Sequence, residues 1–176
     1  MVADLPAIQR LARSKAAENL GFRRYLKAHH VPEAAFHILA GEVARQVDCT
    51  RCANCCRETA VPVTGSDVAA IAAHLRIPAA EVLRLYATRD PDDSAAYLLL
   101  RRGGACVFLD GNLCLIYEAR PRPCRAFPHL AAGPRTLGAR MASVWSRAGI
   151  CPIVYNTIEE YKRRLGYKPR RPPPAV

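Results

Sequence analysis

The eight cysteines of this chain constrain its fold more than any other feature. Four lie within eight residues, in the segment DCTRCANCCRE at Asp48–Glu58, and four more follow singly. Even parity alone would fit four disulfides. Clustered cysteines in a cytosolic chain, however, usually ligate a metal, because cytosolic thiols stay reduced. We therefore predict metal ligation rather than disulfides.

The N-terminal sequence argues against export. The first twenty residues, MVADLPAIQRLARSKAAENL, interrupt every apolar run with a polar or charged residue. They contain no signal-peptide core of roughly 7–15 apolar residues. No window approaches the roughly 18 apolar residues of a membrane span. We expect a soluble, cytoplasmic protein that does not bind membranes.

Length and net charge limit the number of domains and the kinds of partner. A chain of 176 residues with 51% hydrophobic content can bury one ordinary core, so we expect a single small domain. The net charge of +11 could attract nucleic acid or an acidic protein. No basic stripe interleaved with aromatic residues is evident, so we expect a protein partner, and nucleic acid is disfavoured.

Apolar spacing predicts mostly helices, and we find no internal repeat. The expected helices span residues 5–27 with a soft break near Gly21, Pro32 to just before Cys49, a segment capped by Ser66, Pro78 to Thr88, and 151–167 with Cys151 as N-cap. Residues 136–149 fit either helix or strand. The proline-punctuated segment EARPRPCRAFPHL predicts a stiff loop that carries Cys124.

Residues 97–116 form extended apolar runs broken by glycine-containing turns, which predicts a small β-hairpin. The turn around Gly111 decides whether Cys106 and Cys114 share a face. A two-residue Asp-Gly turn would send the two thiols to opposite faces. A three-residue turn that pairs Phe108 with Cys114 would place them on one face, about 7–8 Å apart. If the thiols share a site, we predict the three-residue turn.

The eight cysteines can form one or two metal centres, and two groups of four is the working partition. Three cysteines spaced three apart can point at one cofactor from a tight turn, as in bacterial iron–sulfur sites, whereas the adjacent Cys56 points elsewhere. The predicted first centre is Cys49, Cys52, Cys55 and one remote cysteine; the second is Cys56, Cys106, Cys114 and another remote cysteine. Which centre contains Cys124 and which contains Cys151 stays open.

The metal is either zinc or iron. Four cysteines can hold structural zinc, but zinc ribbons bring two separate C-x-x-C knuckles, and the second half of this chain has none. The overlapping C-x-x-C-x-x-C and the pair Cys151-Pro152 favour an iron–sulfur cluster, expected as 4Fe–4S, over zinc.

Other chemistry has weaker support. Neither a dinucleotide fingerprint nor a phosphate-binding loop is present. The histidines lie mostly on predicted helices, and His129 is expected to support a ligand rather than to be one. Several arginines lie near the cysteines in sequence: Arg51, Arg57, Arg120, Arg122 and Arg125. They are either solvated charges that offset negative centres, or functional groups that donate hydrogen bonds to cluster sulfur or dock an acidic partner.

Three segments together resemble the YkgJ-type cysteine cluster family, also called the CxxCxxCC family. They are DCTRCANCC, CVFLDGNLCLIYEARPRPCRAFP and ICPIVYN. The resemblance extends to about Gly166 and implies zinc or iron chelation by seven cysteines, with Cys151 added by the last segment. Relatives of the family include flagellin lysine N-methylases, which use S-adenosylmethionine.

We predict a mainly helical α+β domain over residues 1–167, in which residues 1–48 form helices that lead into the cluster. A basic, proline-rich disordered tail is expected over 168–176. The main functional hypothesis is metal or iron–sulfur binding for electron or metal transfer to a partner. The alternatives are a methyltransferase-like enzyme with a supporting cluster and a zinc-stabilised interaction or nucleic-acid-binding module.

Overall fold

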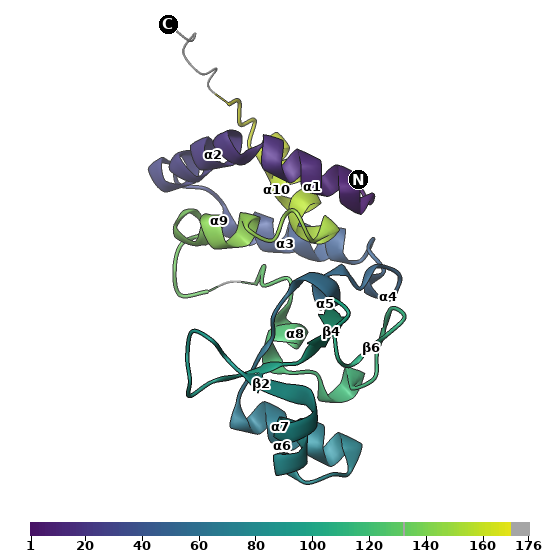
Figure 1. The fold of residues 1–176 in the computed structure, drawn as a ribbon. Coiled ribbons are helices and arrows are strands. Elements are labelled where there is room, and N and C mark those ends of the chain that lie inside the picture. The colour runs from purple at the N-terminus through teal and green to yellow at the C-terminus, as the bar shows by residue number, and fades with distance from the viewer. Residues whose placement is uncertain (132, 170–176) are drawn as a thin grey trace, which may run out of the picture. The chain divides into compact units, whose positions relative to one another are not determined.

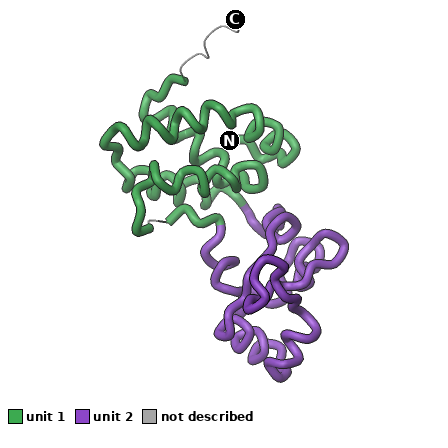
Figure 2. Tube along the Cα trace, turned by 60° about the vertical axis from the view of Figure 1, so that its left-hand side comes forward, with its two compact units in different colours: residues 1–47, 128–176 green, residues 48–127 purple. Residues whose placement is uncertain are grey.

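The computed structural model describes residues 1–131 and 133–169. The chain divides into two compact units (Figure 2): unit 1 comprises Met1–Val47 and Pro128–Val176, and unit 2 comprises Asp48–Phe127. Unit 1 is built from helices, and unit 2 combines short helices with small antiparallel sheets (Figure 1). The predicted class, α+β and mainly α, is confirmed. Residues 170–176 of the predicted tail lie outside the described residues.

Unit 1 packs its helices around an apolar core. These helices are α1 (Leu5–Ser14), α2 (Ala16–Ala28), α3 (Glu33–Ala44), α9 (Leu137–Trp145) and α10 (Pro152–Arg164). The ambiguous stretch 136–149 is therefore largely helical. The largest fully buried side chains of this core include Tyr161, Phe22, Phe36, Ile8, Leu39, Leu137, Met141 and Ile158. No described helix, in either unit, is long and apolar enough to cross a membrane.

The first helical segment breaks at Lys15 and not near Gly21, so that part of the prediction is wrong. Lys15 ends α1 with its N–H bonded to carbonyls of that helix, and it also precedes α2. Gly21 lies inside α2, where a Cβ would come within 2.7 Å of the Tyr167 hydroxyl. The glycine thus makes room for a tyrosine and does not interrupt the helix.

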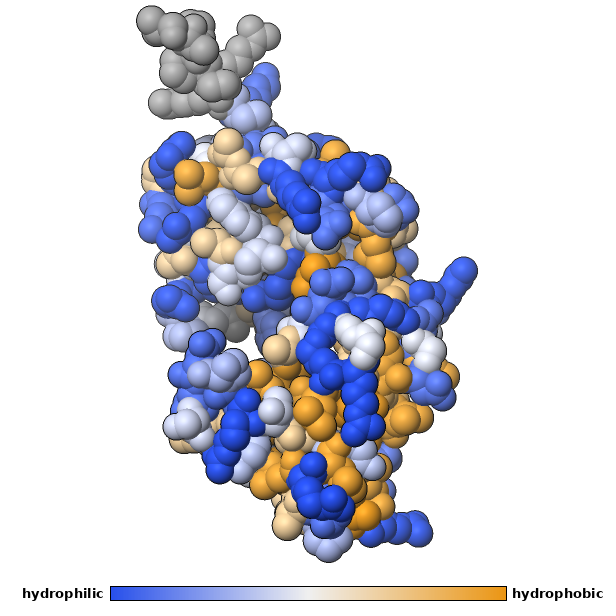
Figure 3. All heavy atoms as spheres, viewed as in Figure 1, coloured by the Kyte–Doolittle hydropathy of each residue, from blue (hydrophilic) through white to orange (hydrophobic). Residues whose placement is uncertain are grey.

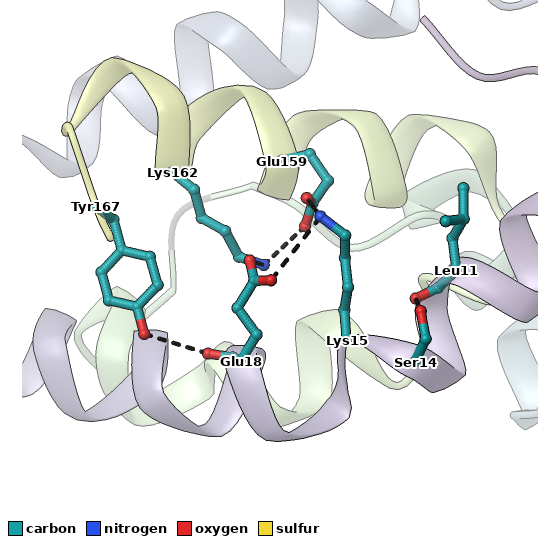
Figure 4. Close-up of polar contacts among 7 residues, drawn as sticks. All are labelled: Leu11, Ser14, Lys15, Glu18, Glu159, Lys162 and Tyr167. Atoms are coloured by element: carbon teal, nitrogen blue, oxygen red, sulfur yellow. Dashed lines mark hydrogen bonds and ion pairs between the residues drawn. The ribbon is translucent and has the colours of Figure 1, made fainter. Parts of the chain in front are cut away.

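A four-charge network joins the start of α2 to α10 (Figure 4). Lys162 Nζ lies 2.7 Å from both Glu18 Oε1 and Glu159 Oε1, and its side chain is 5% exposed. Lys15 also pairs with both carboxylates. Burial opposes the charged form of Lys15, but the hydrogen bond and charge of Glu159 outweigh it, so the pKa of Lys15 is raised. The network compensates charges that would otherwise be buried alone.

Gly138 allows α9 to approach α2 closely. A Cβ there would lie 3.0 Å from Lys27 N and 3.1 Å from Leu26 C, both main-chain atoms. We expect Gly138→Ala to lower the free energy of unfolding by about 1–3 kcal/mol despite the better helix propensity of alanine. Urea unfolding followed by the fluorescence of Trp145, which lies in α9, measures this.

Gly41→Ala is the matched control, since this glycine also lies within a helix. Its Cβ would meet only Arg45 Nη1, at 3.7 Å. Alanine at position 41 should therefore leave stability unchanged or raise it by up to about 1 kcal/mol. Equal effects of the two substitutions would contradict the close approach at Gly138.

The core of unit 2 lies between two helices and a three-stranded antiparallel sheet. The helices are α6 (Gly65–Leu75) and α7 (Ala79–Tyr86), and the sheet has the order β1 (Pro62–Val63), β3 (Tyr97–Leu99), β2 (Ala87–Arg89). Its buried residues are Val61, Val63, Val68, Ile71, Ala72, Val82, Leu99, Phe108, Ile116 and Ala119. This core contains no cysteine among its fully buried members.

Two boundary predictions in unit 2 are wrong. The N-cap of α6 is Thr64 and not Ser66, because Thr64 and Asp67 form a reciprocal capping box. The helix after Pro78 ends at Tyr86 and not at Thr88, because residues 87–89 pair with β3. Pairing within the sheet thus overrides helical spacing at this end.

Two short hairpins replace the single predicted one. β4 (Arg101–Arg102) pairs with β5 (Ala105–Cys106), and β6 (Leu109–Asp110) pairs with β7 (Leu113–Cys114). The predicted three-residue turn is wrong, because Cys114 lies opposite Leu109 and not Phe108. The second turn consists of two residues, Gly111 and Asn112, and Gly111 has φ +56°. A positive φ at the first central position suits glycine.

Candidate metal centre

The four clustered cysteines lie on two one-turn helices. α4 (Cys49–Cys52) is capped by Asp48, whose side chain accepts a hydrogen bond from Thr50 N at 2.9 Å. α5 (Asn54–Glu58) follows directly. Ala53 separates the helices with a left-handed φ of 46° and is buried. The left-handed residue Ala53 therefore separates Cys49 and Cys52 from Cys55 and Cys56, where the sequence predicts one tight turn.

The two hairpins form a tandem repeat of eight residues, which the sequence prediction missed. RRGGACVF at 101–108 and LDGNLCLI at 109–116 each contain a two-residue turn followed two residues later by cysteine. Equivalent backbone bonds also recur, from Val107 N to Leu100 O and from Leu115 N to Phe108 O, both at 2.9 Å. Cys106 and Cys114 therefore occupy equivalent positions in successive hairpins.

Each hairpin cysteine also receives a hydrogen bond from its own chain. The backbone N–H of Phe108 donates to the thiol of Cys106, and that of Ile116 donates to Cys114. Burial nevertheless raises the pKa of both thiols, since it disfavours the thiolate more than these bonds favour it. N–H donors aimed at sulfur are a feature of thiolate centres, where they tune the bound metal.

Cys124 lies on the short helix α8 (Arg122–Ala126), so the loop predicted for it is wrong. Pro123 lies in the first turn of α8, where its missing N–H costs no hydrogen bond. The Arg122 N–H donates to Asp67 Oδ1 at 2.9 Å, which ties α8 to the capping box of α6. The cysteine is thus held on a helix anchored to the core helix α6.

Four thiols from separate segments lie within electrostatic range of one another. They are Cys56, Cys106, Cys114 and Cys124, and every pair within this set interacts. Burial, followed by the negative charges of the other three thiolates, raises the pKa of Cys124 to about 12. Deprotonating all four thiols would bring their negative charges close together, and a bound cation would relieve that repulsion. We call these four residues the thiol set.

Cys56 differs from the other members because hydrogen bonding and positive charge favour its thiolate. The thiol of Cys55 donates to it, and Arg57 and Arg120 contribute positive charge, which lowers the pKa of Cys56 to about 6. Cys49 interacts with both Cys52 and Cys56, and burial, followed by these charges, raises its pKa. The clustered cysteines therefore adjoin the thiol set through Cys56.

Cys151 belongs to unit 1. It is the N-cap of α10, with Pro152 at the first helical position, as predicted, and it is 5% exposed. His129 also lies in unit 1, with a left-handed φ of 59°. Burial and the charge of Arg147 lower the pKa of His129. The ligand roles of all eight cysteines stay predictions.

The donor chemistry of unit 2 fits a thiophilic metal. All eight cysteines are thiols, with no disulfide in the described part of the chain. Within residues 1–131 and 133–169, no three or more histidine, cysteine or acidic side chains have the geometry to hold a metal ion as they stand. The thiol set fits by donor type and mutual proximity, since cysteine sulfur suits zinc and iron–sulfur clusters.

Comparisons with known proteins agree with this chemistry. The family model CxxCxxCC, described as "Putative zinc- or iron-chelating domain", matches residues 48–152, and the chain belongs to this family. The match spans more than half of the chain and all eight cysteines.

A relative and the solved structures give less detail. The chain is 40% identical over 85 residues to Uncharacterized protein MJ0661 of Methanocaldococcus jannaschii, which covers 46% of this chain and 43% of that protein. The chain therefore spans less than half the length of this relative. No solved structure matches the chain significantly.

Proposed function

We propose that this protein binds a metal centre through Cys56, Cys106, Cys114 and Cys124. These four thiols come from α5, β5, β7 and α8, and their electrostatic interaction with one another is the observation that carries the proposal. The N–H bonds to Cys106 and Cys114 support it, because they fix two of the sulfurs from the backbone. The proposal takes Cys124 as the fourth member, which the sequence leaves open between Cys124 and Cys151.

We further propose an iron–sulfur cluster, with zinc as the alternative metal. The C-x-x-C-x-x-C spacing and the Cys-Pro pair favour iron, and hydrogen bonds to sulfur are among the groups that set cluster potentials. A bound cluster would supply one-electron chemistry, whereas zinc in four thiolates would supply stability. The positive charge of Arg120 close to Cys49, Cys56, Cys114 and Cys124 would stabilise a negatively charged centre.

A protein partner that receives electrons or metal is part of the proposal. Hydrophobic residues lie on the visible face of unit 2, with hydrophilic side chains between them (Figure 3). Next to Cys114, the side chains of Leu113, Leu115 and Tyr117 are exposed by 61%, 58% and 51%. The Arg120 guanidinium stacks on Tyr117, 3.6 Å from the ring centroid. Apolar and cationic groups beside the thiols suit an acidic partner with an apolar contact.

The test is the content of iron, zinc and acid-labile sulfide per chain in protein purified without oxygen. We expect iron and sulfide together, with absorbance near about 400 nm. Zinc without sulfide would support the proposed metal binding but overturn the proposed redox role. A chain that binds neither metal, even after reconstitution with iron and sulfide or with zinc, would overturn the proposed function.

A further inference from the structure

Arg57 joins the cysteine helices to the second hairpin turn. Its guanidinium donates to Cys52 O at 3.1 Å, at the end of α4. The same group donates to Gly111 O at 2.7 Å and to Asn112 Oδ1 at 2.6 Å, both in the β6–β7 turn. The planar, forked guanidinium can reach acceptors in two segments at once, which a lysine ammonium does poorly.

Asn112 completes this contact from the other side. Its Nδ2 donates to Arg51 O, also in α4, at 3.3 Å. The turn next to Cys114 is therefore linked to α4 through two side chains, Arg57 from α5 and Asn112 from the turn itself. Neither Arg57 nor Asn112 is expected to ligate the metal, because arginine has no acceptor atom and an amide oxygen suits a thiophilic metal poorly.

Arg101 makes the corresponding contact for the first hairpin. It donates to Thr59 O at 3.1 Å and also to Arg57 O and Gly104 O. Gly104 is in the β4–β5 turn next to Cys106, and residues 57 and 59 lie at the end of α5. Both equivalent hairpins are thus fastened by arginine to the segment that carries the clustered cysteines.

We propose that Arg57 is a positioning residue that, with Arg101 and Asn112, holds the cysteine helices on both hairpin turns before metal binds. This inference rests on the proposed metal-binding function. Unit 2 also has an apolar core of its own, so the frame of the site does not depend on a metal for burial. The metal would then leave and enter a site that stays folded. Zinc fingers differ, because they unfold without zinc.

The experiment measures how fast the native metal leaves the full-length protein for an excess of chromophoric chelator. Arg57→Ala should accelerate release roughly 10–100-fold, the usual cost of removing a group that orients metal ligands. Arg57→Lys should recover little of this loss, because one ammonium cannot reproduce the fork. Asn112→Ala provides a second variant and should also accelerate release, in case Arg57→Ala fails to fold.

Two controls separate positioning from general stability. Arg84→Ala removes an exposed arginine that pairs with Glu81 on α7, and it should leave the release rate unchanged. Val82→Ala truncates a core side chain that is 1% exposed, so it lowers the melting temperature without touching the arginine contacts. Circular dichroism of the metal-free variants supplies their melting temperatures.

The outcomes distinguish this inference from the proposed function. Release from Arg57→Ala within twofold of wild type would overturn the positioning role while metal binding stands. The positioning role would also be overturned if Val82→Ala and Arg57→Ala had the same melting temperature and accelerated metal release equally. A wild-type protein that cannot be loaded with metal would overturn the proposed function, and the positioning role with it.

Discussion

Serine in place of Cys124 should remove the metal held by the thiol set, and serine in place of Cys106 should do the same. Each substitution removes one of four sulfurs and offers a poorer ligand to a thiophilic metal. The loss of affinity should exceed the roughly 10–100-fold that follows the loss of a supporting group. Metal analysis of anaerobically purified variants, by iron, zinc and sulfide per chain, measures it.

Combining the two substitutions tests whether Cys106 and Cys124 serve one centre. If they do, the double variant should lose no more metal than either single variant, because one lost ligand already empties the site. If the chain holds a second centre, Cys49→Ser should remove different metal from Cys124→Ser, and the metal losses of the two variants should add. Additive losses for Cys106 and Cys124 would contradict their assignment to the same centre.

The sequence identified the chemistry of this site better than its geometry. Clustered thiols indicate a metal from residue type alone, since few other structures use so many reduced cysteines. Which cysteines come together depends on long-range packing. Cys124 comes within electrostatic range of Cys56 on α8, which the hydrogen bond from Arg122 N to Asp67 Oδ1 ties to α6. No local pattern around Cys124 contains that information.

The hairpins show how a one-residue error in a turn misleads. The prediction considered turns centred on Asp110-Gly111 or on three residues, whereas the turn consists of Gly111 and Asn112. Comparison of RRGGACVF with LDGNLCLI could have found this, because Gly103-Gly104 aligns with Gly111-Asn112. The signal was the equal spacing from glycine to cysteine in both segments.

The arginine contacts could not be predicted from sequence. The sequence shows only that Arg57 lies beside the cysteines, whereas two of its acceptors are in the turn at Gly111 and Asn112, 54 and 55 residues away. Arg101 carries no sequence signal for the site. Carbonyl acceptors carry no side-chain signal, so the partners of an arginine that binds carbonyls become visible only in the fold.

Lys162→Met should lower the free energy of unfolding of unit 1 by about 3 kcal/mol. The substitution keeps most of the apolar stem and removes the charge that compensates Glu18 and Glu159. We expect the lower end of the range for breaking a buried pair, because Lys15 still contacts both carboxylates, which are 24% and 23% exposed. Urea unfolding monitored by Trp145 fluorescence measures the loss.

Arg163→Met is the matched control, because it removes a charge one residue further along α10. The Arg163 side chain is 74% exposed and pairs with Glu160, so its loss should change stability by no more than about 1 kcal/mol. Adding Glu18→Gln to Lys162→Met should restore part of the lost stability, since it removes an uncompensated carboxylate. If the double variant were less stable than Lys162→Met alone, uncompensated charge would not be the cause of the loss.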